Sequence, residues 1–180
     1  MQTGLEGYKQ WRGGDREAFA DTVAAYNKKL IYYVGNLIGS YEEAEDLVSE
    51  AFLRLLMKKP SFDSEEQLAA WLFKTARNLC FDLMRKRKTD PFELSDDLPV
   101  DGELLSAVVK DETARELHDT MKELSPDYRD VLILLYFGGL SYDQAGAVMK
   151  KNTAQIKNLA FRAKQSLKEK LERKGFHYED

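Results

Sequence analysis

The chain has almost no residues that form cross-links or bind metals. Its 180 residues include one cysteine, Cys80, and two histidines, His118 and His177. A single cysteine excludes an internal disulfide, and three such residues cannot supply the four ligands of a structural zinc site. No serine–histidine–aspartate set, glycine-rich phosphate loop or metal-ligand cluster is present either. We therefore expect that the protein is not an enzyme and binds neither a metal nor a cofactor. We also expect both histidines to be ordinary surface residues.

Long hydrophobic runs are also missing. The apolar stretches fall well short of the roughly 20 residues that span a bilayer, and the N-terminus lacks a signal-peptide pattern. Hydrophobic residues make up 43% of the chain and charged residues 32%, as is typical of soluble globular proteins. These features predict a cytoplasmic protein without a membrane span.

The charge is negative overall but unevenly distributed. The net charge is −4 and the pI about 5.4, which is unusual for a DNA-binding protein. Lysine and arginine nevertheless cluster at 74–88 and at 157–174, while acidic residues gather between them at 90–112. Phosphate binding depends on the local basic surface, whereas a negative total weakens long-range attraction. We expect weak DNA binding by the chain alone and stronger binding when a partner holds it there.

Apolar residues recur every three or four positions through most of the first 89 residues, which predicts helices. One long helix covers 19–38 and ends near Gly39, and Pro60 stops the next one. A third helix follows and ends in a run of four basic residues at 85–88. Capping boxes predict the starts of the second and third helices, and their members are Ser40 with Glu43 and Ser64 with Gln67.

The periodicity fades between 90 and 110, where two prolines and a glycine stand among acidic residues. This stretch has the composition of an acidic linker. Helical periodicity resumes at about Asp111. The predicted fold class is therefore all-α, with two small helical domains at 1–89 and 111–180 joined by the linker at 90–110.

The last third of the chain has the pattern of a helix-turn-helix. A short helix over 141–149 opens with a capping box formed by Ser141 and Gln144. A polar break at 150–152 precedes a basic helix from Thr153 to about Leu171. Two short helices joined in this way, the second of them basic, can place a helix in the major groove of DNA. DNA binding is therefore the leading functional hypothesis.

Four segments in order resemble the sigma factors of bacterial RNA polymerase, specifically the small extracytoplasmic-function type. Residues 14–19 are similar to that family's opening helix, 44–52 to its polymerase-binding helix, 70–82 to its minus-ten helix, and 124–129 to the start of its minus-thirty-five domain. The resemblance covers nearly the whole chain. It implies a promoter-specificity subunit that binds core polymerase, holds two promoter elements and helps to melt the DNA.

The second helix carries a polar face opposite its apolar stripe. Taken alone, this face is most simply a solvated surface. The resemblance implies instead that it binds the coiled coil of the polymerase β′ subunit, with the β flap as another contact on the core enzyme. An acidic surface that meets a basic partner gives fast, oriented association. The residues expected in this contact are Asp46, Ser49, Glu50 and Arg54.

The third helix and the loop before it are the expected minus-ten site. The amide of Asn78 can donate and accept at a base edge, and the basic end of the helix can neutralise phosphates. The resemblance implies that an extruded base is captured between this helix and the loop at 58–65. The residues assigned to this site are Phe62, Lys74, Arg77, Asn78, Asp82 and Arg85.

The second helix of the helix-turn-helix presents an outward arc with the chemistry of base recognition. Asn and Gln suit adenine, Arg suits guanine or phosphate, and an aromatic ring can contact a thymine methyl. An outward Phe161 also suggests a partner, because large apolar groups on a surface usually have one. The residues assigned to the minus-thirty-five element are Ala154, Gln155, Asn158, Phe161, Arg162 and Gln165. The family usually has other residue types at Ser49, Gln155 and Leu159 and in the Lys150-Lys151 turn.

One alternative remains within transcription. A stand-alone helix-turn-helix regulator would bind DNA without polymerase, although the low pI and the docking helix argue against it. The sequence gives neither the promoter sequence nor the inducing signal. It also leaves open whether an anti-sigma factor is a further partner.

Overall fold

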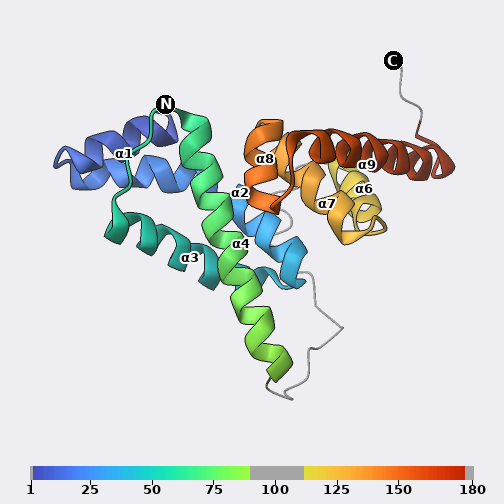
Figure 1. The fold of residues 1–180 in the computed structure, drawn as a ribbon, viewed down its shortest axis with the longest axis horizontal. Coiled ribbons are helices and arrows are strands. Elements are labelled where there is room, and N and C mark those ends of the chain that lie inside the picture. Colours follow the sequence, from blue (N-terminus) through green and yellow to red (C-terminus); the bar gives the residue numbers. More distant parts are fainter. Residues whose placement is uncertain (1, 90–111, 177–180) are drawn as a thin grey trace.

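All of the regular structure is helical in residues 2–89 and 112–176, the parts of the chain that the computed structural model describes (Figure 1). None of these helices combines the length and the apolarity that a membrane span needs. The N-terminal half contains α1 (Gly4–Arg12), a 3₁₀ turn η1 (Arg16–Ala18), α2 (Phe19–Ile38), α3 (Tyr41–Lys58) and α4 (Glu65–Thr89).

Local sequence sets the ends of these helices. Gly39 adopts a left-handed conformation with φ of 74°, and its N–H donates to the carbonyl of Gly35 to end α2. The Ser40 side chain accepts the N–H of Glu43 at the start of α3. Lys59 is also left-handed, with φ of 50°, directly before Pro60. Helix α3 therefore ends where the sequence predicted.

The C-terminal half contains α6 (Glu112–Met121), α7 (Pro126–Leu132), a π-helical turn η2 (Ile133–Phe137), α8 (Tyr142–Met149) and α9 (Thr153–Arg173). Complete capping boxes begin α8 at Ser141 and Gln144, and α9 at Asn152 and Gln155. Lys150, left-handed with φ of 57°, turns the chain between them. The predicted helix-turn-helix is confirmed. The predicted linker at 90–110 lies outside the described residues.

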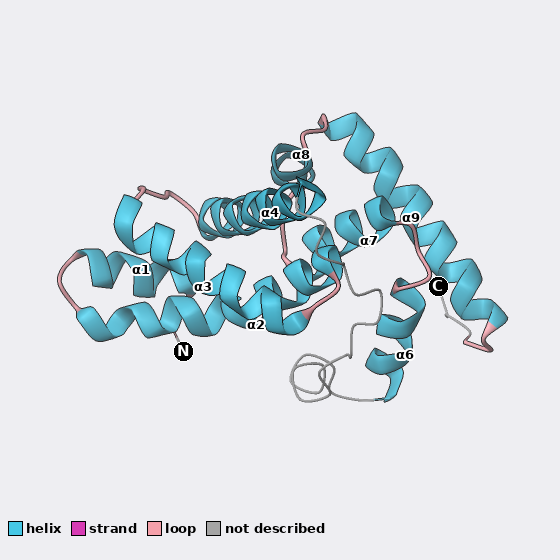
Figure 2. Ribbon diagram, turned by 90° about the horizontal axis from the view of Figure 1, so that it is seen from below, coloured by secondary structure: helices cyan, strands magenta, loops and turns pink. Residues whose placement is uncertain are grey.

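The two halves pack against each other. Helix α4 contacts α8, and α2 contacts α7 (Figure 2). Gly138 makes a close approach possible, because a Cβ there would lie 2.8 Å from the Leu134 carbonyl oxygen and 3.1 Å from the Phe73 ring. The buried apolar side chains of both halves form one continuous cluster. The helix-turn-helix therefore lies beside α4.

His118 belongs to this shared core, so its expected surface position is wrong. It is 2% exposed, and its Nδ1 lies 2.9 Å from the hydroxyl of Tyr32 on α2. Burial lowers the pKa of His118 to about 4; the charge of Lys122 adds to this effect and that of Asp119 opposes it. The helical spacing of His118 from Ala114 and Met121 indicated a buried face. His177 lies outside the described residues.

The buried histidine predicts a loss of stability in acid. In the folded protein the pKa of His118 is about 4, below the ordinary value of 6.5 that we assign to the unfolded chain. The unfolded state therefore binds more protons in this window, and the free energy of unfolding falls as the pH drops through it. We expect this group to cost about 3 kcal/mol across the window.

Urea unfolding of the wild type and of His118→Phe from pH 7 to about pH 4 measures this contribution. The variant lacks the titrating group, so its unfolding free energy should fall less steeply. Parallel profiles for the two proteins would show that His118 is not the source.

Candidate nucleic-acid interface

The outward arc of α9 is fully accessible. The predicted minus-thirty-five residues are all exposed, and Phe161 is 68% exposed. A shallow hollow of about 250 Å³ lies along this arc, lined by Lys151, Gln155, Asn158, Leu159 and Arg162. A basic turn and polar side chains around a hollow suit both phosphates and base edges. The Gln155 side chain accepts the N–H of Asn152 at 2.9 Å, so it also caps its own helix.

The outer face of α3 contains the predicted polymerase contacts. Asp46, Ser49 and Glu50 are exposed, and Arg54 is partly exposed and pairs with Glu50 at 3.6 Å. Exposed pairs of this kind contribute little to stability. The Glu50–Arg54 pair therefore does not prevent this face from binding a partner.

Two apolar residues on the same face were not predicted. Leu53 is 50% exposed and Met57 is 74% exposed. Their spacing from Asp46 and Glu50 places all four on one side of α3, since positions three, four, seven and eight apart share a helical face. Apolar side chains within a charged rim are typical of a protein-binding surface. These two residues could have been found from the sequence, because both are apolar and lie outside the buried apolar stripe of α3.

One face of α4 brings together four of the predicted minus-ten residues. Lys74, Asn78, Asp82 and Arg85 follow one another at helical spacing, and all are exposed or partly exposed. Asp82 forms an ion pair with Arg85. Asn78 therefore lies within a charged stripe, and its exposed side chain is accessible to a ligand.

The other two predicted minus-ten residues lie elsewhere. Phe62 is 9% exposed, with its ring 5.5 Å from that of Tyr8 and 6.3 Å from that of Trp71. Trp71 is itself partly buried. Arg77 is turned toward the C-terminal half, and its side chain is 15% exposed. In this arrangement neither Phe62 nor Arg77 presents its side chain on the exposed stripe of α4.

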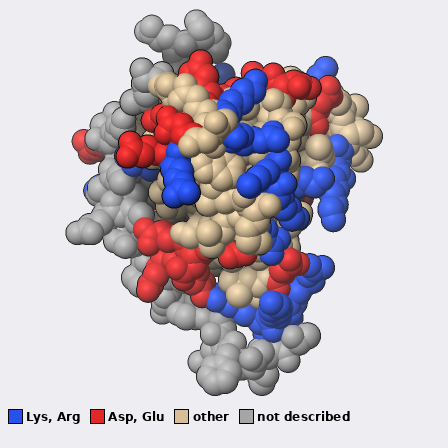
Figure 3. Space-filling model, turned by 90° about the vertical axis from the view of Figure 1, so that its left-hand side faces the viewer, with Lys and Arg blue, Asp and Glu red and all other residues tan. Residues whose placement is uncertain are grey.

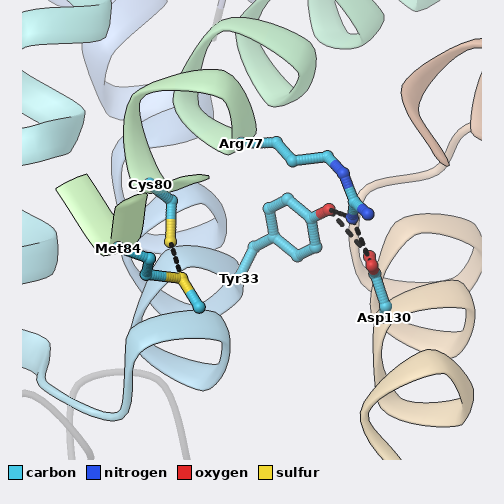
Figure 4. Close-up of polar contacts among 5 residues, drawn as sticks. All are labelled: Tyr33, Arg77, Cys80, Met84 and Asp130. Atoms are coloured by element: carbon cyan, nitrogen blue, oxygen red, sulfur yellow. Dashed lines mark hydrogen bonds and ion pairs between the residues drawn. The ribbon is translucent and has the colours of Figure 1, made fainter. Parts of the chain in front are cut away.

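Arg77 takes part in a buried contact between the two halves (Figure 4). It forms an ion pair with Asp130 of α7 and donates to the hydroxyl of Tyr33 of α2 at 2.8 Å. The Tyr33 hydroxyl donates to Asp130 at 2.7 Å. Burial raises the pKa of Asp130, and the Arg77 guanidinium opposes that rise. Three helices from both halves therefore meet at one polar cluster.

This cluster predicts a large cost for removing one charge. Asp130→Ala should lower the free energy of unfolding by about 3–5 kcal/mol, because it leaves a buried guanidinium without its counter-charge. The double variant Arg77→Met with Asp130→Leu should recover much of this loss, since apolar replacement of a whole buried pair is often neutral. Urea unfolding measures both. A double variant as unstable as Asp130→Ala would contradict the assignment.

The end of the molecule formed by α1 and α3, at the left of Figure 1, is seen face-on in Figure 3. Lysine and arginine side chains gather down the centre and right of this face, and acidic side chains lie mostly at its left and along its top. The net charge of −4 therefore hides local surfaces of both signs.

Both halves match known families. Residues 22–89 match the family described as Sigma-70 region 2, and residues 114–167 match Sigma-70, region 4. The chain is 30% identical over 175 residues to the ECF RNA polymerase sigma factor SigW of Bacillus subtilis (strain 168), which covers 91% of this chain and 94% of that protein. It is 37% identical over 130 residues to the ECF RNA polymerase sigma factor SigM of the same organism. That match covers 69% of this chain and 77% of SigM.

Solved structures have the same fold. One is the sigma factor RpoE in complex with the anti-sigma factor NepR from Bartonella quintana, with a TM-score of 0.68 and 26% identity over 86% of this chain and 96% of that one. Another is CnrH in complex with the cytosolic domain of CnrY, with a TM-score of 0.63 and 22% identity over 96% of this chain and 99% of that one.

A sigma-70 region 2 followed by a sigma-70 region 4 with a helix-turn-helix defines a bacterial transcription initiation factor. The chain belongs to the extracytoplasmic-function group of the sigma-70 family, whose members direct RNA polymerase to specific promoters. The resemblance seen in the sequence is confirmed, and the stand-alone regulator is not favoured.

Proposed function

We propose that three separate surfaces of this chain carry its part in promoter recognition. The outer face of α3 binds core polymerase, the exposed stripe of α4 with the preceding loop binds the minus-ten element, and the arc of α9 binds the minus-thirty-five element. The observation that supports this division is that the predicted residues fall on three distinct exposed faces, apart from Phe62 and Arg77. The chain would act in the cytoplasm and catalyse no reaction itself.

Docking on the core enzyme uses both charge and apolar contact. Asp46 and Glu50 would meet basic residues of the β′ coiled coil, while Leu53 and Met57 are covered by it. Opposite charge speeds and orients association, and burial of the two apolar side chains slows dissociation. The β flap is the proposed second contact, made by the C-terminal half.

Charge reversal on α3 tests this docking. Asp46→Lys with Glu50→Lys should weaken binding to core polymerase in a pull-down and abolish run-off transcription from a genomic fragment library. Circular dichroism should be unchanged, because both side chains are exposed. The matched control, Glu17→Lys with Glu66→Lys, changes the charge equally at exposed sites on η1 and α4. Docking through α3 is wrong if both double variants bind core enzyme as the wild type does.

The α4 stripe would recognise an unpaired base. Asn78 is exposed between Lys74 and Asp82, with no intramolecular hydrogen bond from its side chain among those found in the described residues. Its amide can pair with a base edge, while Lys74 and Arg85 attract the neighbouring phosphates. Arg77 would reach DNA only if it left Asp130, so Asn78 is the stronger candidate.

We expect Asn78→Ala to reduce promoter opening more than initial binding. A good edge contact contributes about 1–3 kcal/mol, and here it forms only with an extruded base. Permanganate reactivity reports the opened DNA, and a gel shift at low temperature reports initial binding. Asn158→Ala on α9 is the matched control and should weaken initial binding instead. Equal losses in both assays for Asn78→Ala would refute the assignment.

The arc of α9 would read the minus-thirty-five duplex. Its exposed Asn158, Arg162 and Gln165 can contact base edges, and Phe161 can cover a thymine methyl. Ala154 and Gln155 lie in the first turn of α9, where the helix dipole favours phosphate, although the N–H of Gln155 already donates to the Asn152 side chain. The basic Lys151 beside the hollow would add a further phosphate contact.

An anti-sigma factor is a further proposed partner. Support comes from the similar sigma factor that was solved with its anti-sigma factor. An apolar cavity of about 330 Å³ also lies between α2, α6, η2 and α9, lined in part by Tyr32, Leu117, His118 and Phe137. A partner that covers it would contact both halves at once.

A further inference from the structure

Helix α1 precedes the residues that match the sigma-70 families, which begin at residue 22. It nevertheless contacts the α3–α4 loop, residues 59–64, directly. The Tyr8 hydroxyl donates to the carbonyl oxygen of Pro60 at 2.6 Å, and the Arg12 guanidinium donates to the Ser61 hydroxyl at 2.9 Å. Two side chains one helical turn apart therefore hold two successive loop residues.

Aromatic side chains of α1 contact two further residues of the same loop. The ring of Phe62 lies 5.5 Å from that of Tyr8, and the Lys59 ammonium lies 5.7 Å from the ring of Trp11. Each α1 contact on residues 59–62 uses a side chain from one face of the helix, since positions 8, 11 and 12 are neighbours on a helical surface. The loop therefore rests along α1 for most of its length.

The same helix also fixes the start of α4. The N–H of Leu5 donates to the Glu65 carboxylate at 2.9 Å. Helix α1 is itself seated closely on its neighbours, because a Cβ at Gly7 would lie 2.7 Å from the carbonyl oxygen of Ala18. The hydroxyl of Thr22 anchors it further by donating to the Gly4 carbonyl at 2.8 Å. Helix α1 is thus a fixed support for the loop.

We propose that α1 positions the α3–α4 loop for base capture, with Tyr8 and Arg12 as positioning residues. This proposal rests on the proposed role of the loop and α4 in taking an extruded base. A short irregular loop loses conformational entropy when a ligand orders it, roughly 1–2 kcal/mol for each residue fixed. A loop already held in its binding conformation avoids much of that loss, which strengthens binding and sharpens selectivity.

A variant at Tyr8 can distinguish a positioning role from direct contact with DNA. Its side chain is 1% exposed, so it does not reach a nucleic acid, and burial raises the pKa of its hydroxyl, which therefore keeps the proton it donates. Tyr8→Phe keeps the ring that packs on Phe62 and removes only the hydrogen bond to Pro60. Its effect on DNA must therefore pass through the loop.

The test uses holoenzyme assembled from core polymerase and the full chain. Its probes are single-stranded minus-ten oligonucleotides in which each position carries each of the four bases in turn. For Tyr8→Phe we expect about two- to tenfold weaker binding to the preferred base at the captured position, the range that one hydrogen bond supplies. Discrimination among the four bases there should fall by a similar factor.

Two variants serve as controls. Tyr41→Phe removes a phenol hydroxyl at the opposite end of α3, some 26 Å away along an 18-residue helix, and should leave base discrimination unchanged. Asn78→Ala tests base capture itself. Thermal unfolding of each variant shows how much stability has changed.

Each pattern of results decides the matter. Reduced discrimination in Tyr8→Phe, with Tyr41→Phe unchanged, supports positioning by α1. A uniform loss for all four bases, or no loss, overturns it, because a merely structural role does not alter the ratio between bases. If Asn78→Ala weakens discrimination while Tyr8→Phe does not, only the positioning by α1 fails. If neither variant alters it, base capture and the positioning fail together.

Discussion

The buried contact among Tyr33, Arg77 and Asp130 is the interaction on which the arrangement of the two halves depends (Figure 4). A buried ion pair is favourable only where its charged atoms and hydrogen bonds meet in good geometry. Desolvating the charges offsets most of their attraction, so the cluster adds little net stability. Its effect is to fix α7 against α2 and α4. Phe73 packs closely against Gly138 at the same boundary between the halves.

This contact also explains how one helix can serve two purposes. Arg77 and Asn78 are adjacent in sequence, but neighbouring residues of an α-helix point about 100° apart. Arg77 therefore faces the C-terminal half, while Asn78 stays exposed beside Lys74 and Asp82. The helix-turn-helix lies against one side of α4 and leaves its polar stripe uncovered. Helix α4 therefore carries both the contact with α7 and the exposed stripe.

Local features of the fold were predictable, and long-range contacts were not. The helix ends at Gly39, Ser141 and Asn152 follow from capping, which acts within four residues and can be read from a short window. The positions of Phe62 and Arg77 depend on partners more than 50 residues away, Tyr8 and Asp130. No local pattern identifies such partners. An arginine that neutralises a phosphate and one that neutralises a buried carboxylate have the same sequence signature.

The charge of the chain illustrates the same difference between local and global properties. A total of −4 argues against DNA binding only if the charges act at long range. At physiological ionic strength the screening length is about 8 Å, so a phosphate responds mainly to the side chains nearest to it. The exposed acidic residues of α3 and the basic residues of α9 lie on different helices. The net charge of −4 therefore does not argue against DNA binding by α9, because a phosphate bound at that helix lies closest to the side chains of α9 itself.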